Sequence, residues 1–274
     1  MNILTRWPQR LRCFFVRCST KIIPFCFVFQ FKKFHYRRLL KYFPENREPD
    51  LKMLPYLIRE GDHVVDVGAS IGIYTKKLAQ LVGHAGCVHS IEPIPEVFKI
   101  LSANVQVFRL ENVREYNCCI SDDSGMATME IPIDQRGIEN HYLARIVSSS
   151  ANQGFSQIQI PKKTLDELFS EAETRISFIK IDTEGHELPC IRGAEGIIRK
   201  FMPSLLIEIS GEPDVIESEA FHLFAFLNKL GYEPYFFNGI NLCRRVVHLD
   251  RSTNYFFLGS RHTGILREQG ILSS

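Results

Sequence analysis

A short apolar strand that runs into a glycine turn and then a helix constrains the fold of this chain most. Residues 64–75 read VVDVGASIGIYT, and the valines favour a strand buried in a parallel sheet. Gly68 and Gly72 frame the turn. A Cβ atom at Gly68 would obstruct the bend or a ligand, and Gly72 lets the next helix pack closely on the strand. Residues 74–83, YTKKLAQLVG, have the spacing of an amphipathic helix closed by a glycine, so the run predicts a unit that holds a nucleotide-shaped cofactor.

The spacing of the glycines and of a later carboxylate indicates which part of a nucleotide is bound. The dinucleotide fingerprint G-x-G-x-x-G is not met, because Ser70 and Ile73 occupy the second and third glycine positions. A second strand over residues 87–93, CVHSIEP, contains Glu92, 20 residues after Gly72. At this spacing a carboxylate accepts hydrogen bonds from the hydroxyls of a ribose. The sequence therefore predicts a nucleoside site rather than a pyrophosphate site.

Strands and helices alternate along the rest of the chain, which predicts a parallel sheet with helices on both faces. Residues 96–107 have helical spacing, and further strands are expected at residues 113–121, 176–182, 204–210, 233–237 and 255–259. Residues 122–160 are polar, with glycine and serine clusters, and we interpret them as a β-rich insertion near the substrate entrance. Thr164, three residues before Glu167, predicts a capping box that opens the helix before the fourth strand.

The segment that leaves the fourth predicted strand, residues 182–187 (DTEGHE), carries three carboxylates and an imidazole. Asp182 is the first choice for an active-site carboxylate, and His186 is the alternative base because an imidazole titrates near neutral pH. The competing interpretation is that Glu184 or Glu187 caps the next helix and that His186 faces solvent. The carboxylates also suit Mg²⁺, but the sequence shows no second acidic cluster to complete such a site, so no metal site is predicted.

Two further carboxylates, Asp122 and Asp123, follow the third predicted strand. A carboxylate at the carboxyl edge of the sheet can accept a hydrogen bond from an adenine amino group, and Asp122 is the stronger candidate for this role. The alternative is a simple Asp-Asp-Ser-Gly turn.

Charge is distributed unevenly along the chain. Residues 1–44 contain ten Lys or Arg and no acidic residue, whereas the remainder carries a net charge of −8. The apolar segment at residues 22–31 is too short for a membrane-spanning helix and contains Pro24. We consider three roles for this basic arm: a helix packed on the domain, peripheral contact with an anionic membrane, and contact with nucleic acid. Nucleic acid is the least favoured partner.

Cysteine usage indicates a reduced cytosolic setting. The eight cysteines show neither a CxxC pair nor the spacing of metal ligands. Cys87, Cys118 and Cys119 fall in predicted buried strands, where a cysteine is usually a small hydrophobe. Neither a zinc site nor a disulfide framework is expected.

Several motifs occur in an order that resembles one family. They are DVGASIGIYT, SIEP, CISDDSG, TLDEL, and FIKIDTEGHE followed by IRGAEGII. Together they resemble the FkbM family of S-adenosylmethionine-dependent methyltransferases over about residues 45 to 260. Ser70 departs from the family, which more often has asparagine at this position.

The resemblance implies a fold, a division of the chain and a set of site residues. The fold is a Rossmann-like class I methyltransferase α/β fold, with a seven-stranded, mostly parallel sheet whose last strand is antiparallel. The methyltransferase domain covers residues 45–262, after a basic extension at residues 1–44 and before a tail at residues 263–274. The expected catalytic residues are Asp182, His186 and Glu184. The residues expected to bind S-adenosylmethionine are Asp66, Gly68, Ala69, Ser70, Gly72, Tyr74, Glu92, Pro93, Asp122 and Asp182.

Relatives of the family methylate hydroxyl groups, so the resemblance implies an O-methyltransferase acting on a sugar, a glycolipid or another natural product. The tetrapeptides N-P-P-Y and D-P-P-Y, expected of many amino-directed nucleic-acid methyltransferases, are absent. Alternatives are N-methylation of nucleic acid or protein, and a non-catalytic module that binds S-adenosylmethionine. A nicotinamide-dependent oxidoreductase is a more distant possibility. The expected location is cytoplasmic, with or without peripheral attachment to a membrane.

Overall fold

The computed structural model describes residues 25–134, 137, 139–147, 154–170, 175–247 and 252–273. The chain forms two compact units, Met1–Tyr42 and Phe43–Ser274. The described part of the first unit is the helix α2 (Phe25–Lys41), whose last turn is basic, as suits the negative end of a helix dipole. Residues 22–24 of the apolar segment and residues 148–153 of the expected insertion lie outside the described residues. No helix within the described ranges is long and apolar enough to cross a lipid bilayer.

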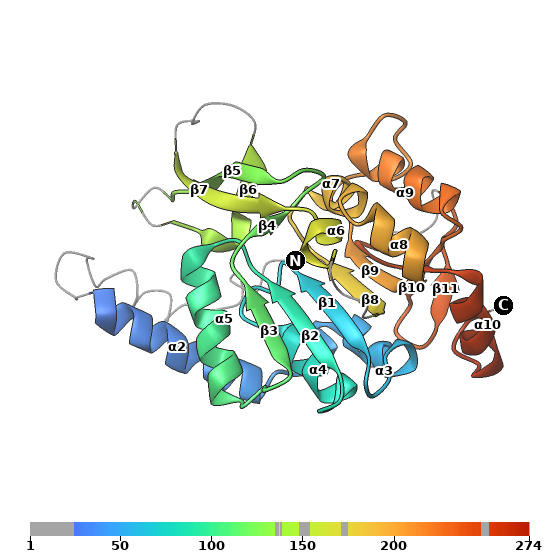
Figure 1. The fold of residues 1–274 in the computed structure, drawn as a ribbon, viewed down its shortest axis with the longest axis horizontal. Coiled ribbons are helices and arrows are strands. Elements are labelled where there is room, and N and C mark those ends of the chain that lie inside the picture. Colours follow the sequence, from blue (N-terminus) through green and yellow to red (C-terminus); the bar gives the residue numbers. More distant parts are fainter. Residues whose placement is uncertain are drawn as a thin grey trace. The chain divides into compact units, whose positions relative to one another are not determined.

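Eight strands form the main sheet of the second unit, in the order β11, β10, β12, β9, β8, β1, β2 and β3 (Figure 1). The adjacent strands from β3 to β9 are parallel, whereas β12 is antiparallel to both β9 and β10. This arrangement confirms the Rossmann-like class I α/β fold and its antiparallel last strand. The strands are β1 (His63–Val67), β2 (Cys87–Ile91), β3 (Val113–Tyr116), β8 (Ile176–Ile181), β9 (Ser204–Glu208), β10 (Glu233–Phe237), β11 (Leu242–Arg244) and β12 (Asn254–Leu258).

Two features of the sheet differ from the expectation. The sheet has eight strands instead of seven, because β11 pairs antiparallel with β10 and adds an edge strand. The third predicted strand, residues 113–121, is divided into β3 and a separate strand, β4 (Cys119–Ile120), which belongs to another sheet. The chain therefore leaves the main sheet at Tyr116, and a sequence pattern with apolar residues on both sides of the break did not reveal it.

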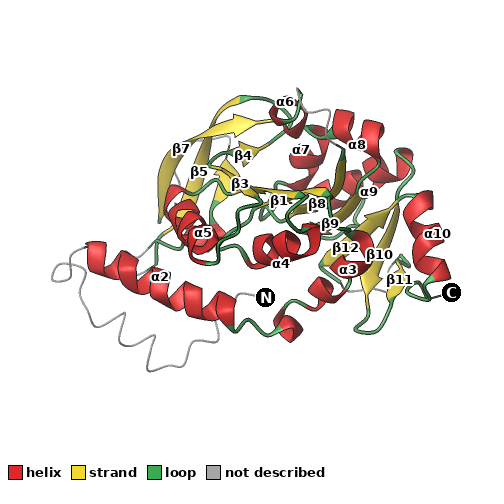
Figure 2. Cartoon of the chain, turned by 60° about the horizontal axis from the view of Figure 1, so that its bottom comes forward, coloured by secondary structure: helices red, strands yellow, loops and turns green. Residues whose placement is uncertain are grey.

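Helices cover both faces of the main sheet, as Figure 2 shows. On one face, Val65 and Ile179 pack in a core with α7, α8 and α9. On the other face, Val64 and Phe178 pack with α3, α4 and α10. Adjacent strand residues thus serve opposite cores, which is why these central strands are apolar at nearly every position. The helices are α3 (Leu54–Leu57), α4 (Ile73–Val82), α5 (Pro95–Val107), α6 (Leu165–Leu168), α7 (Glu187–Arg192), α8 (Glu195–Phe201), α9 (Glu219–Lys229) and α10 (Ser260–Glu268).

The inserted segment forms a second, four-stranded sheet in the order β4, β7, β5 and β6. The strands β5 (Gly125–Pro132), β6 (Arg145–Val147) and β7 (Phe155–Lys163) are antiparallel, and β4 pairs parallel with β7. A small core joins this sheet to Ile94 and Val97 at the start of α5. The 3₁₀ turn η4 (His141–Leu143) lies between β5 and β6. The expected β-rich insertion is therefore present and is held at the start of α5.

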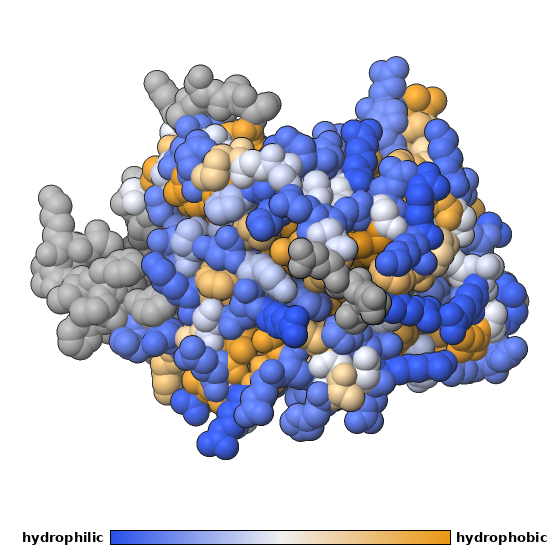
Figure 3. Space-filling model, in the orientation of Figure 1, coloured by the Kyte–Doolittle hydropathy of each residue, from blue (hydrophilic) through white to orange (hydrophobic). Residues whose placement is uncertain are grey.

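Two peripheral segments complete the second unit. The 3₁₀ turns η2 (Glu45–Arg47) and η3 (Pro49–Lys52) precede α3. At the other end, Leu266 of α10 is 1% exposed and lies in the same core as Val64, so residues beyond 262 form part of this unit. Thr164 caps α6, with its hydroxyl accepting from the Glu167 N–H at 2.9 Å. The other half of the predicted capping box does not form, because the Thr164 N–H donates to Ser124 Oγ and the Glu167 carboxylate accepts from the same hydroxyl. Figure 3 shows a face that is mostly hydrophilic, with apolar side chains in small groups.

Candidate active site

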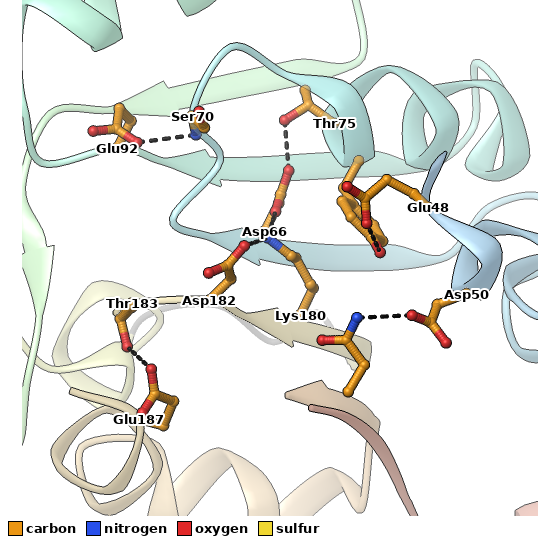
Figure 4. A network of polar contacts seen from close by, with 12 residues as sticks. Glu48, Asp50, Asp66, Ser70, Thr75, Glu92, Lys180, Asp182, Thr183 and Glu187 are labelled. Carbon is orange, nitrogen blue, oxygen red and sulfur yellow. Dashed lines mark hydrogen bonds and ion pairs between the residues drawn. The ribbon is translucent and has the colours of Figure 1, made fainter. Parts of the chain in front are cut away.

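Carboxylates from separate parts of the chain meet at the carboxyl edge of the main sheet (Figure 4). Asp66 lies near the end of β1, Glu92 follows β2 and Asp182 follows β8. These strands are parallel, so their carboxyl ends share one edge, which is where open α/β sheets bind ligands. The structure therefore brings together three of the residues that the sequence predicted.

A row of polar side chains crosses three central strands at this edge. Strand register places Ser90 of β2 beside Asp66 of β1, and Asp66 beside Lys180 of β8. The hydroxyl of Thr75 on α4 donates to Asp66 Oδ2 at 2.7 Å and lies 2.9 Å from Ser90 Oγ. Buried polar groups are normally paired in this way.

One atom of the row has no hydrogen-bond partner among the described residues. Asp66 is fully buried, but its Oδ1 accepts no hydrogen bond from the described residues, and Lys180 Nζ is 3.8 Å away. Burial raises the pKa of Asp66 above its ordinary value. An unsatisfied buried carboxylate oxygen is costly, and the nearby charge of Lys180 offsets part of this cost.

Lys180 is the cation of the site. Its Nζ lies 3.0 Å from Asp182 Oδ2 and 4.7 Å from the centre of the Tyr74 ring. Burial alone would lower the pKa of Lys180, but the charges of Asp182 and Asp66 reverse this effect and raise the pKa. Lys180 therefore stays protonated and compensates part of the buried negative charge.

Asp182 forms a carboxyl pair with Glu208. Ile181 pairs with Ile207, so the next positions, Asp182 and Glu208, lie side by side at the edge. Burial and the charge of Asp182 raise the pKa of Glu208 to about 8, and the two side chains share a hydrogen bond. Burial opposes ionisation of Asp182, but Lys180 and the bond from Glu208 hold its pKa below the ordinary value. At neutral pH the Glu208 carboxyl keeps its proton and donates a hydrogen bond to the Asp182 carboxylate.

Glu92 is buried, with 5% of its surface exposed, and is held from both sides. Its Oε2 accepts the Ser70 N–H and its Oε1 accepts the Ile94 N–H, each at 2.9 Å. Burial raises the pKa of Glu92 to about 7 despite these bonds. Each oxygen keeps a further lone pair, so the predicted contact with ribose hydroxyls is chemically available.

Neighbouring protein atoms leave no room for a side chain at the two glycines of the turn. A Cβ atom on Gly68, whose φ is +75°, would lie 1.8 Å from the Asp182 backbone oxygen. A Cβ atom on Gly72 would lie 2.9 Å from Leu101 Cδ1, so its close contact is with α5 and not with the preceding strand as predicted. Ser70 has a φ of 51°, a left-handed conformation that asparagine tolerates better than serine.

The segment before β1 lines the site as well. The Tyr74 hydroxyl donates to Glu48 Oε2 at 3.4 Å, and Asp50 Oδ2 accepts a bond from Asn254 at 2.8 Å. Burial raises the pKa of Tyr74, Glu48 and Asp50. Tyr74, predicted to bind the cofactor, thus stands between Glu48 and Lys180.

The remaining residues of the DTEGHE segment separate into different roles. Glu187 is buried, and its Oε1 accepts from Gly185 N–H at 2.9 Å and from Thr183 Oγ1 at 3.3 Å, which braces the turn before α7. Glu184 is exposed with a φ of 53°. His186 is half-buried, with Nε2 3.0 Å from Ser121 Oγ, and burial lowers its pKa. His186 therefore does not face solvent freely, as one interpretation held, and remains an alternative base.

Three other predicted residues lie around this edge. Asp122 is exposed, accepts from Ser121 Oγ at 3.1 Å and follows β4 of the second sheet, so the premise that it follows the third strand of the main sheet is wrong. The Ala69 N–H bonds to Ile91 O at 3.0 Å, and the Pro93 carbonyl accepts from Asn117 at 2.9 Å. Adenine contact by Asp122 stays a prediction.

Sequence reasoning missed Lys180 and Glu208. Both lie inside segments that were identified as apolar strands, FIKID and LLIEIS. A charged residue in an otherwise apolar parallel strand is the signal that could have revealed them, since such residues are almost never fully buried without a partner.

The family of the chain follows from comparison with known proteins. The methyltransferase FkbM domain matches residues 66–234, which is more than half of the chain. The chain belongs to the FkbM methyltransferase family. The match begins at Asp66 and includes Glu92, Lys180, Asp182 and Glu208.

Individual relatives are more distant. Methyltransferase 1 of Beauveria bassiana is 20% identical over 53% of this chain and 64% of its own length. The 31-O-demethyl-FK506 methyltransferase FkbM of Streptomyces tacrolimicus is 40% identical over 26% of this chain and 27% of its own. The crystal structure of methyltransferase FkbM from Methylobacillus flagellatus is 18% identical over 72% of this chain and 43% of that chain, with a TM-score of 0.45. The chain thus spans less than two thirds of the length of these relatives.

S-adenosylmethionine is the cofactor that this family implies, and the residues fit it. Glu92, whose two carboxylate oxygens each keep a lone pair, suits the ribose hydroxyls. When bound, the cofactor supplies a methyl group on a sulfonium ion, which needs a nucleophile in line. The Asp182 and Glu208 pair lies beside Lys180 at the same edge.

Proposed function

We propose that the chain transfers a methyl group from S-adenosylmethionine to a hydroxyl oxygen of a sugar, a glycolipid or a related natural product, with Asp182 as the base. The observation that carries this proposal is the position of Asp182, whose carboxylate lies 3.0 Å from Lys180 Nζ and beside Glu208 at the carboxyl edge of the sheet. It lies at the sheet edge that also carries Asp66 and Glu92.

The proposed chemistry is a single displacement. As the acceptor oxygen bonds to the methyl carbon and the carbon–sulfur bond breaks, the hydroxyl proton passes to Asp182 and S-adenosylhomocysteine leaves. Positioning supplies most of the acceleration, and a base assists by taking the proton as the bond forms. Lys180 holds the carboxylate in place, while Glu208, protonated at neutral pH, orients it through their hydrogen bond.

Names of related proteins support transfer to oxygen. The Streptomyces tacrolimicus relative is a 31-O-demethyl-FK506 methyltransferase, and a protein-L-isoaspartate O-methyltransferase of Methanothrix thermoacetophila is 39% identical over 20% of this chain. The FkbM domain match includes the site residues but does not identify the acceptor molecule. A carbohydrate or lipid-linked glycan is proposed because such acceptors present closely spaced hydroxyls for a carboxylate to deprotonate.

Cofactor binding is tested first, by calorimetric titration of S-adenosylhomocysteine into the full chain. We expect micromolar affinity that Glu92→Gln weakens at least tenfold, because the ribose hydroxyls lose an acceptor. Glu195→Gln on α8, which breaks only an exposed pair with Arg199, is the matched control. Absence of binding in the unmodified chain would contradict the assignment of the cofactor. Equal affinity in Glu92→Gln would contradict the contact between Glu92 and the ribose.

Turnover is tested with isotope-labelled methyl donor and a panel of glycans, glycolipids and polyols. Asp182→Asn keeps the size of the side chain but removes its basicity, so we expect methyl transfer to fall by a factor of about 10² to 10⁴. Binding of S-adenosylhomocysteine should persist. A non-catalytic binding module would instead show no transfer in the unmodified chain, and transfer unaffected by Asp182→Asn would remove Asp182 from the mechanism.

We also propose that residues 1–44 bring the enzyme to an anionic membrane surface, where lipid-linked acceptors would lie. The helix α2 has no acidic residue in its sequence and contains Lys32, Lys33, Arg37, Arg38 and Lys41. Each basic residue near an anionic surface contributes about 1 kcal/mol of attraction. Sedimentation with vesicles that contain phosphatidylserine should retain the full chain and lose a variant without residues 1–40. Equal sedimentation of both would contradict this role.

A further inference from the structure

Three metal-donor side chains meet at the opposite edge of the sheet, at the amino ends of β1 and β2. They are His63, Cys87 and His89, and one ligand atom of each lies within 4.8 Å of the others. Register explains the grouping: His63 pairs with Cys87, and His89 follows Cys87 by two residues, on the same face of the strand. Among the described residues, no other three His, Cys, Asp or Glu side chains lie close enough together to hold a metal ion.

The surroundings orient one of these donors. His89 Nδ1 lies 3.1 Å from the Tyr116 hydroxyl on β3, and the Phe169 ring packs edge-on against the imidazole at 4.7 Å. Histidine ligands of metals commonly have their second ring nitrogen held by such a partner, which fixes the tautomer and the ring. With Nδ1 occupied by Tyr116, Nε2 of His89 is the nitrogen left to bind.

The geometry points to a zinc site formed by His63, Cys87 and His89, with the fourth position open to water. Two imidazoles and one thiolate are a ligand set that Zn²⁺ prefers. Three atoms within 4.8 Å of one another lie at most about 2.8 Å from a common centre. Zinc bonds are about 2.0 to 2.3 Å long, so shifts of at most about 0.5 to 0.8 Å close the site.

The Cys87 thiol loses its proton when zinc binds, because coordinating thiols are deprotonated outright.

The zinc site is separate from the proposed active site. His63, Cys87 and His89 lie on the sheet face of Val65, whereas Asp66, Ser90 and Thr75 belong to the other face and the other end. The ion therefore does not take part in methyl transfer; it links β1 to β2 and stabilises the fold. Spacing did not reveal the site, because its ligands come from two strands and form no CxxC pair.

The test uses the full chain after dialysis against EDTA, titrated with Zn²⁺ and, separately, with Co²⁺. We expect one equivalent of Zn²⁺ that Cys87→Ser and His63→Asn weaken at least a hundredfold. His63 is only half-buried, so its variant is the less demanding for folding. Co²⁺ should give a thiolate charge-transfer band in the near ultraviolet that Cys87→Ser abolishes. Tyr116→Phe should weaken binding about tenfold, since it removes the bond that orients His89.

Cys243→Ser and His84→Asn are matched controls, because Cys243 is half-buried on β11 and His84 is exposed. Both should bind Zn²⁺ like the unmodified chain, and Zn²⁺ should raise the Tm of each but not that of His63→Asn. The site is refuted if the unmodified chain binds no Zn²⁺. It is also refuted if Cys87→Ser and His63→Asn, shown to be folded by circular dichroism, keep the same stoichiometry and affinity.

Discussion

The substitution Glu92→Gln tests both the hydrogen bonds of Glu92 and the effect of its burial. Two backbone N–H groups, from Ser70 and Ile94, each donate to a separate carboxylate oxygen at 2.9 Å. Glutamine offers one acceptor oxygen, and its NH₂ group would face the other N–H. An unsatisfied buried donor costs about 1 to 3 kcal/mol, so we expect this loss of unfolding free energy near pH 4.5, where Glu92 is protonated in the folded chain and about half protonated in the unfolded chain.

The cost should then shrink as pH rises. Burial raises the pKa of Glu92 from the ordinary value of 4.5 to about 7, so the folded chain binds a proton that the unfolded chain releases. Stability from this group is therefore present below pH 4.5 and lost as pH rises towards 7. At ~1.4 kcal/mol for each pH unit, the loss is about 3 kcal/mol by pH 7. Glutamine does not titrate, so the variant escapes this loss and its disadvantage disappears or reverses.

The assay is urea denaturation of both proteins without cofactor, at intervals from pH 4.5 to 8 and at constant salt. Glu208, whose pKa is also raised, contributes to the slope of both proteins and cancels in the difference. The variant Glu111→Gln, at an exposed position, should stay within about 0.5 kcal/mol of the unmodified chain throughout. A difference between Glu92→Gln and the unmodified chain that does not vary with pH would refute the argument.

Other substitutions test the turn and the buried cation by denaturation. Gly68→Ala should cost more than about 3 kcal/mol, because its Cβ meets a backbone oxygen, whereas Gly61→Ala, with φ +86° and no atom within 4 Å, should cost about 1 to 2 kcal/mol; equal losses would contradict this. Ser70→Gly should stabilise the chain by about 1 kcal/mol, since φ is 51°, and a loss of stability would show that the side chain has an unseen role. Lys180→Met should cost about 3 to 5 kcal/mol by leaving Asp182 and Asp66 without their cation, and a neutral effect would mean that the two carboxyl groups do not depend on its charge.

The periodicity of the sequence predicted most of the helices and strands. Central strands of a parallel sheet are buried on both faces, so apolar runs such as residues 204–210 mark them within a residue or two: β9 covers Ser204–Glu208. The break between β3 and β4 was missed because Cys118 and Ile120 are as buried as strand residues of the main sheet. The edge strand β11 has three residues, too few for a periodic signal.

The candidate site was predicted only where a residue ends a strand. Asp182 and Glu92 could be found because each follows an apolar run at the edge that binds ligands. Lys180 and Glu208 could not be assigned, because their roles depend on strand register: Asp66 lies opposite Lys180, and Ile181 opposite Ile207. Register between strands that are far apart in the sequence is set by the whole sheet and leaves no local pattern.

Register also connects the two ends of the sheet. The same pairing of β1 with β2 that places His63 beside Cys87 places Asp66 beside Ser90. A slip by one residue would turn Asp66 to the opposite face and separate it from Thr75, while also dispersing the metal donors. A zinc ion bound at the amino ends of these strands would therefore hold, from the opposite edge, the alignment on which the cofactor site depends. Removing zinc should then weaken S-adenosylhomocysteine binding in the unmodified chain and leave it unchanged in a folded Cys87→Ser variant.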